Sequence, residues 1–216
     1  VTDENFIEYE HFKKIFGEDG NVIYIGYKDS SMFSLEHFSN LQNICENLEK
    51  IEGVEKVLSI TNVYAITKND SLKKFDFQPV VKKKPTSQAE MDSLKNIIYK
   101  QRFYEKLLFN KDSNIFLIGV TLKKKQLNDK SRFGIVEAIK TNLNEYSQKY
   151  SIEMHYSGLP YIRTVITQMI QDELYLFIAI SLVISAIVIA LFFKSLYVVL
   201  TSMLIVAVSV IWSLGV

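Results

Sequence analysis

Cysteine is almost absent from this sequence, with Cys45 alone among 216 residues. A single thiol cannot form an internal disulfide, so a small fold held together by disulfide bonds is excluded. Cys45 falls within an apolar stripe at helical spacing, and we interpret it as a small core residue.

A surplus of basic residues is also absent. The chain has 25 lysines and arginines against 24 acidic residues, and without Lys194 the two classes are equal in number. Nucleic-acid-binding domains depend on a basic face, so we expect no nucleic-acid partner. The lysine triplets at 82–84 and 123–125 are better explained as solvated loops than as phosphate sites.

Catalytic and cofactor motifs are absent as well. His11, His37 and His155 lie far apart in the sequence and show no metal-ligand spacing. The glycine-containing segment 16–21, FGEDGN, has neither the lysine of a phosphate-binding loop nor the spacing of a dinucleotide-binding motif. We therefore predict that the protein is not an enzyme and has no catalytic residue, metal ligand or cofactor.

Charge is missing from two long apolar runs, residues 174–193 and 196–216. About 20 apolar residues in a helix are enough to cross the hydrocarbon core of a bilayer. A soluble domain of this size rarely buries two such runs, although a buried hairpin in a soluble core is the alternative. The runs predict a transmembrane helical hairpin with Lys194 and Ser195 at its tip.

Lys194 is the one residue from Leu174 to Val216 whose side chain is charged at neutral pH. At the tip of a hairpin its charge can reach headgroups and water, and positive charge favours the cytoplasmic side. This predicts a cytoplasmic tip and an extracytoplasmic location for residues 1–172. The alternative is that Lys194 is simply tolerated at a membrane interface.

In the chain before these runs, hydrophobic periodicity and capping residues predict an alternation of helices and strands. Leu41 belongs to the apolar stripe of one helix, so we expect its side chain in the core. The expected helices are 2–16, 34–53, 87–108 and 131–150, and the expected strands are 22–27, 54–60, 115–122 and 152–158. Thr2 would cap the first helix, Gly53 would end the second, and a capping box of Ser87 and Glu90 would begin the third. In the fourth helix, one face would carry the apolar and aromatic residues Phe133, Val136, Ile139, Leu143 and Tyr146.

A strand-helix-strand pattern therefore occurs twice, around residues 22–60 and 115–157, with 62–110 as an insertion between the two. This arrangement suits a ferredoxin-like (split βαβ) α+β domain over residues 1–160, with helices packed on an antiparallel sheet. The order of the strands does not follow from the sequence.

The segment after the last expected strand predicts one long helix. Pro160 is tolerated in a first helical turn, and the helical pattern then continues without a breaker over residues 161–193. We expect this helix to contain the first membrane span, 174–193, and to be followed by the second span, 196–216. Such a helix could transmit motion of the preceding domain to the bilayer.

Several short motifs in this chain occur in a familiar order. They are Ile51–Ser59 (I-x-G-V-x-x-V-x-S, containing Gly53), Gly158-Leu159-Pro160 (G-x-P), Phe193-Lys194-Ser195 (F-[RK]-S) and the glycine-containing Ser213-Leu214-Gly215. With this order and spacing the chain resembles the RND superfamily, specifically its MMPL/Patched-like exporters. The resemblance covers nearly the whole chain, and residues 62–110 carry none of its motifs.

The resemblance implies a multi-pass exporter of the bacterial inner membrane, driven by the proton motive force, that moves lipids or other hydrophobic and amphiphilic compounds. The chain, which begins with valine, would be a piece of it: an extracytoplasmic (periplasmic) porter domain, forming part of the substrate path, and transmembrane helices two and three of one half. Its partners would be the rest of the same polypeptide, membrane lipids and the substrate, with a homo-oligomer left open.

The resemblance gives structural or coupling roles to a few residues. These residues are Gly53, Gly158, Pro160, Lys194 and Ser195. It assigns no substrate-binding residue, and it places the acids of the proton relay beyond Val216, so no relay residue is expected in this chain.

Two other functions are compatible with a domain that precedes membrane helices. One is a permease of an ABC-type system with a periplasmic domain, although the two-residue tip Lys194-Ser195 is short for an element that contacts an ATPase. The other is a membrane-anchored sensor or scaffold. An intramembrane acid in the next helix would favour the exporter.

Overall fold

A computed structural model describes residues 7–8, 11–12, 20–69, 74–126, 131–193 and 195–214. The chain divides into two compact units, an N-terminal unit (Val1–Thr164) and a C-terminal unit (Val165–Val216). The helices are α2 (Leu35–Glu49), α3 (Gln88–Lys100), α4 (Ser131–Tyr150), α5 (Leu159–Phe193) and α6 (Leu196–Leu214), with short 3-10 turns η1 (Ile60–Asn62), η2 (Arg102–Tyr104) and η3 (Lys124–Gln126). The strands are β1 (Val22–Lys28), β2 (Val54–Leu58), β3 (Tyr64–Asn69), β4 (Lys74–Pro79), β5 (Phe109–Asn110), β6 (Ile115–Leu122) and β7 (Met154–Ser157).

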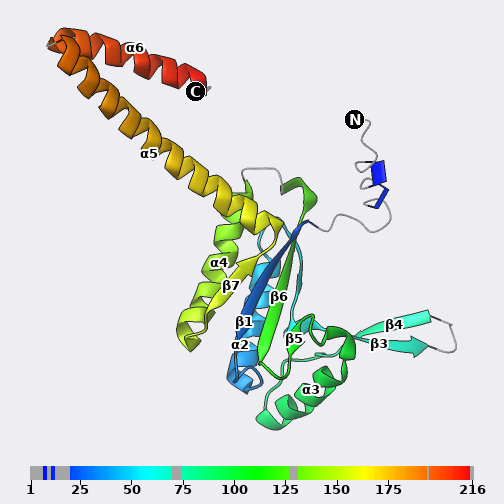
Figure 1. Ribbon diagram of the computed structural model, residues 1–216. Helices are drawn as coiled ribbons and strands as arrows, with labels where there is room; N and C mark the ends of the chain where they lie inside the picture. Colours follow the sequence, from blue (N-terminus) through cyan, green and yellow to red (C-terminus); the bar gives the residue numbers. More distant parts are fainter. Residues whose placement is uncertain are drawn as a thin grey trace. The chain divides into compact units, whose positions relative to one another are not determined.

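One antiparallel sheet organises the N-terminal unit. Its strands run in the order β2-β6-β1-β7, and the two-residue β5 also pairs with β6 (Figure 1). The two predicted strand-helix-strand segments are therefore interleaved, because β6 lies between β1 and β2 while β1 lies between β6 and β7. The expectation of an α+β unit on an antiparallel sheet is confirmed.

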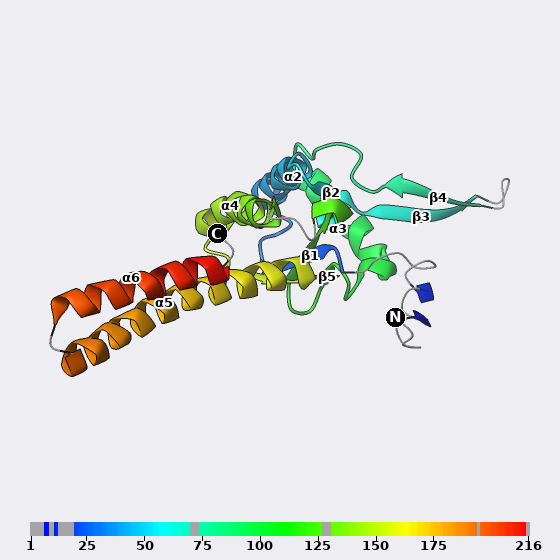
Figure 2. The ribbon, with the colours of Figure 1, turned by 90° about the horizontal axis from the view of Figure 1, so that it is seen from above.

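The core of the N-terminal unit lies between this sheet and helices α2 and α4, which lie side by side (Figures 1 and 2). Alternate residues of β1 and β6 are buried, as expected for strands with one covered face. Leu41 and Cys45 are buried on α2, so both core predictions are confirmed. Phe133 was expected on the buried stripe of α4 but is only half-buried, whereas Arg132 is buried.

Two helix starts follow from capping residues. The Ser34 side chain accepts a hydrogen bond from the amide of His37, and the Ser87 side chain accepts one from the amide of Glu90. Each bond satisfies an N–H group that has no partner within the helix. The predicted start of the helix after Ser87 is therefore confirmed.

The predicted end of that helix, at 108, is wrong because α3 stops at Lys100. Gln101 leaves the helical region with ψ at 80°, and the chain turns through η2. Tyr104 becomes buried, and its hydroxyl accepts a hydrogen bond from the amide of Tyr64. The turn also lets Phe109 pair with Phe116 on β6, so tertiary contacts override the helical pattern.

Other boundaries differ from expectation by a few residues. The helix expected to end at Gly53 ends at Glu49, and Gly53 lies in the following turn with φ at 101°. Strand β2 ends at Leu58, before η1, and β7 is limited to Met154–Ser157. Of the helix expected over 2–16, the described residues 7–8 and 11–12 are helical, and its cap Thr2 lies outside the described residues.

The segment 62–110 contains structure that the sequence did not predict. Strands β3 and β4 form a separate two-stranded antiparallel sheet, in which Tyr64 pairs with Pro79. Helix α3 and β5 complete the segment, and β5 joins it to the main sheet (Figure 1).

The C-terminal unit contains most of α5 and all of α6. Within the described part of the chain, α5 is the one helix long and apolar enough to span a membrane, and the apolar stretch of α6, Tyr197–Ser213, is shorter. Many large apolar side chains are exposed on both helices, including Phe177, Phe192 and Trp212. Water-exposed apolar surfaces of this extent are rare in soluble monomers. The second membrane span, expected over residues 196–216, remains a prediction.

Candidate functional site at the start of the apolar helix

A very tight turn joins the last strand of the sheet to α5. Gly158 follows β7 directly and has φ at 105°, a backbone conformation that other residues rarely adopt. A Cβ atom at this position would lie 2.2 Å from the carbonyl oxygen of Val22, in the backbone of β1. Glycine is therefore required at position 158 both for its backbone angle and for lack of space.

The next residues attach the first turn of α5 to the N-terminal unit. Pro160 is buried, and proline fits the first turn of a helix because its missing N–H needs no partner there. The amide of Ile162 donates to the Gly158 carbonyl at 3.0 Å, which starts the helical hydrogen bonds. Leu159 lies close to Gly20, where an added Cβ would be 3.0 Å from the leucine side chain.

A buried polar contact ties this first turn to α4. The Thr164 hydroxyl donates to the carbonyl of Pro160 at 2.8 Å, and the Arg132 Nε donates to the same hydroxyl at 3.1 Å. Both side chains are buried. Buried charged groups are stable only with hydrogen-bond partners, so this contact holds the start of α5, up to Thr164, against α4 within the N-terminal unit.

Tyr156 and Tyr161 add an aromatic contact across the same turn. Their ring centroids are 5.4 Å apart and the rings are stacked at 27°, an arrangement that stabilises aromatic pairs beyond the area that they bury. Burial raises the pKa of the Tyr156 phenol above its usual value, so this side chain is neutral at physiological pH. The last strand and the first helical turn are thus held together on both sides of Gly158.

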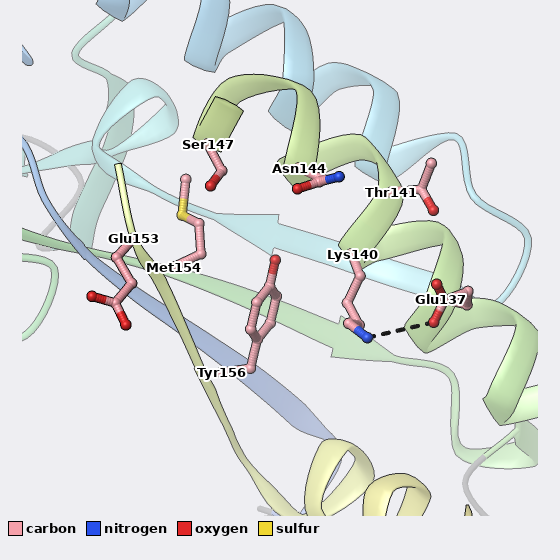
Figure 3. A pocket seen from close by; sticks show the side chains of 8 residues that line it. All are labelled: Glu137, Lys140, Thr141, Asn144, Ser147, Glu153, Met154 and Tyr156. Carbon is pink, nitrogen blue, oxygen red and sulfur yellow. Dashed lines mark ion pairs between the residues drawn. The ribbon is translucent and has the colours of Figure 1, made fainter. Parts of the chain in front are cut away.

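Tyr156 also lines a polar groove between α4 and β7 (Figure 3). The groove has a volume of about 460 Å³. Glu137 and Lys140 form an ion pair at 3.6 Å on its α4 side. Its lining residues are Glu137, Lys140, Thr141, Asn144, Ser147, Glu153, Met154 and Tyr156. The junction therefore borders a groove on the surface of the N-terminal unit.

A family model described as the MMPL family matches residues 10–216. The chain belongs to the MMPL family. The match includes both the N-terminal unit and the apolar helices, so membership does not depend on the apolar runs alone. MMPL proteins are membrane transporters of the RND type, and membership makes this chain part of a larger transporter polypeptide. The comparison with curated proteins gave no match.

The motif residues of this MMPL chain fall at different places. Gly158 and Pro160 meet at the junction. Gly53 lies at the same end of the sheet but beside the outer strand β2, where its carbonyl accepts a hydrogen bond from the amide of Lys123 at 2.8 Å. Lys194 lies outside the described residues, and the Ser195 carbonyl accepts from the amide of Val199 at 3.2 Å, at the start of α6.

Two buried polar contacts of the MMPL chain were missed from the sequence. Arg132 gave a signal, because it lies three, four and seven residues before the buried Ile135, Val136 and Ile139 and so belongs to the apolar stripe. The contact of Asp29 with His37 left no signal in the sequence, because the side chains that contact Asp29 come from separate elements.

Asp29 is the centre of a buried polar cluster. Its carboxylate accepts hydrogen bonds from the amide of Ser31 and the hydroxyl of Tyr146, and it lies 2.8 Å from His37 Nδ1. Burial raises the pKa of Tyr146, and the neighbouring Asp29 raises it further. The cluster joins the end of β1 to α2 and α4. No group of histidine, cysteine and acidic residues suited to a metal ion occurs among the residues that the structure describes.

The first prediction concerns Gly158. Replacement Gly158→Ala should lower the free energy of unfolding of the N-terminal unit by about 3 kcal/mol, since the new methyl group meets the Val22 carbonyl and φ becomes unfavourable. Gly26→Ala on the neighbouring strand is the matched control, because no atom lies within 4 Å of a Cβ placed there. Chemical denaturation followed by circular dichroism measures both. Equal stability of the two variants would contradict the role assigned to Gly158.

Proposed function

We propose that this chain is part of a proton-motive-force-driven exporter that moves lipids or other hydrophobic and amphiphilic compounds across the bacterial inner membrane. The observation that carries the proposal is the MMPL match, which extends over the N-terminal unit and the apolar helices together. The N-terminal unit would form part of the substrate path, and the rest of the same polypeptide would complete the transporter.

The N-terminal unit would be a porter domain of the ferredoxin-like (split βαβ) type. Its strand order β2-β6-β1-β7 supports this, because each strand-helix-strand segment encloses a strand of the other. The segment 62–110 would be an insertion between the two halves of that fold. Residues 1–160 would form the porter domain, although α5 begins at Leu159.

The C-terminal unit would form two membrane spans, 174–193 and 196–216. The length and apolar character of α5 support the first span, and the charge-free sequence of α6 supports the second. Residues 1–172 would lie on the periplasmic side, with Lys194 and Ser195 at a cytoplasmic tip. The pair Asp172-Glu173 would then be the polar boundary above the first span.

Coupling between the two units would depend on the continuity of α5. This helix extends without a break from Leu159 to Phe193, and its first turn is held by the buried contact between Arg132 and Thr164. Movement of the porter domain would therefore displace the helix that enters the membrane. The acids that take up protons would come from the rest of the transporter, because ionisable residues inside a bilayer are costly and usually functional.

The function is tested with the full-length transporter in proteoliposomes. Export of a fluorescent amphiphile should require an imposed proton gradient and should stop when an uncoupler is added. A Gly-Gly insertion after Gln168 should strongly reduce export by interrupting the helical connection, while the two glycines cost only about 1 kcal/mol each. The matched control is the same insertion after Asp112, in the turn between β5 and β6.

Two results would contradict this proposal. Export that depends on ATP and ignores the gradient would favour the ABC-type system. Full export by the Gly-Gly variant after Gln168, with the folded N-terminal unit confirmed by circular dichroism, would show that a continuous helix is not needed.

Membrane topology gives a separate prediction. Cysteine replacements at the exposed Ser93 and at Ser195 should differ in cells whose outer membrane has been removed and whose inner membrane is intact. A membrane-impermeant maleimide should label position 93 and should not reach position 195. The unmodified chain is the control, since Cys45 is buried and burial raises its pKa to about 11, which keeps the thiol protonated and unreactive. Labelling at 195 and protection at 93 would reverse the proposed orientation.

A further inference from the structure

A second groove lies on the segment 62–110, which carries none of the family motifs. It has a volume of about 580 Å³, within the range of about 300–1,000 Å³ that is usual for small-molecule sites. One wall is the chain from Val80 to Thr86, and the other is α3. The apolar residues Val80, Val81, Ala89, Leu94 and Ile97 line it, and the lysines 82–84 are also part of its lining.

Hydrogen bonds hold both walls of this groove in place. The amide of Val80 donates to the carbonyl of Val63 at 2.9 Å, and the Lys84 Nζ donates to Asn43 and Glu46 on α2 at 2.7 and 2.9 Å. At the start of α3, the Gln88 side chain accepts from the amide of Leu35 and donates to the carbonyl of Phe33, each at 3.0 Å. The groove is therefore a preformed feature of the N-terminal unit.

The charged side chains around the groove differ in whether they have a hydrogen-bond or ion-pair partner. Glu90 is bound by the amide and hydroxyl of Thr86, and the amide contact lowers the pKa of its carboxyl. Lys84 is paired with Glu46. Lys82 and Lys83 are exposed, and neither has a hydrogen bond or ion pair within the described part of the chain. Two lysine charges without an ion pair thus lie beside an apolar surface, and Glu90 adds one negative charge to the same lining.

We propose that this groove binds a single amphiphile with an anionic headgroup. Lys82 and Lys83 would contact the phosphate or carboxylate, and the apolar chain would lie on Val80, Leu94 and Ile97. The half-buried Leu94 and the exposed Ile97 (46% exposed) leave apolar surface that such a chain would cover. This inference rests on the proposed function and adds the charge class of the substrate and a place where the porter domain would bind it.

The probe is monomeric dodecyl phosphate, titrated calorimetrically into the purified chain in phosphatidylcholine nanodiscs, with empty nanodiscs as the background. The double variant Lys82→Gln/Lys83→Gln should weaken binding by about tenfold, since two exposed charge pairs are lost. Ile97→Gln should also weaken it. The matched control is Lys123→Gln/Lys125→Gln in the other lysine triplet, which lies outside the groove and should bind as the unmodified chain does.

Three results would overturn the proposal. Equal binding by the Lys82/Lys83 variant and the control would exclude the lysines as the anion site. Dodecanol binding as tightly as dodecyl phosphate would show that the charge plays no part. Association with anionic vesicles, without binding of monomeric dodecyl phosphate, would identify a membrane contact in place of a substrate groove.

The binding test needs neither a gradient nor transport, which separates the two proposals. Binding of dodecyl phosphate that depends on Lys82 and Lys83, without gradient-driven export, would support the groove proposal and contradict the proposed exporter function. Gradient-driven export, combined with dodecyl phosphate binding that does not depend on Lys82 and Lys83, would support the exporter and overturn the groove proposal.

Discussion

The approach of Gly158 to the backbone of β1 is the contact on which the rest of the junction depends. It allows β7 to end and α5 to begin within one residue, because no side chain separates the turn from the Val22 carbonyl. Further along α5, the Thr164 hydroxyl accepts a hydrogen bond from the Arg132 Nε within the N-terminal unit. The start of α5 is therefore determined by a steric constraint at one glycine and then fixed by a buried hydrogen bond.

This construction suits a transporter of the MMPL family. A helix that is anchored in a folded unit and then becomes wholly apolar can carry a displacement, whereas a flexible linker cannot. The polar groove beside Tyr156 borders the anchored turn.

Much of this fold could be predicted from hydrophobic periodicity. The buried stripe of α2, including Leu41 and Cys45, and the strands β1 and β6 were recovered because their apolar residues repeat regularly over many positions. The glycine and proline of the junction were also found, as motif residues. Local patterns contain this information because burial on one face imposes them.

The remaining features depend on contacts between distant segments. The strand order is set by pairings such as that of Gly26 with both Leu117 and His155, which no local pattern encodes. The end of α3 at Lys100 follows from the burial of Tyr104. Asp29 was missed because the side chains that satisfy it come from α2 and α4.

Native-state hydrogen exchange of the first turn of α5 tests the central claim most directly. If the N-terminal unit fixes the start of this helix, the amides of Ile162 and Thr164 should exchange only through global unfolding, with the same opening free energy and denaturant dependence as the amide of Leu41 in the core. Exchange of the first-turn amides at a much lower opening free energy, while Leu41 stays protected, would show that the helix frays from the unit and would contradict the account.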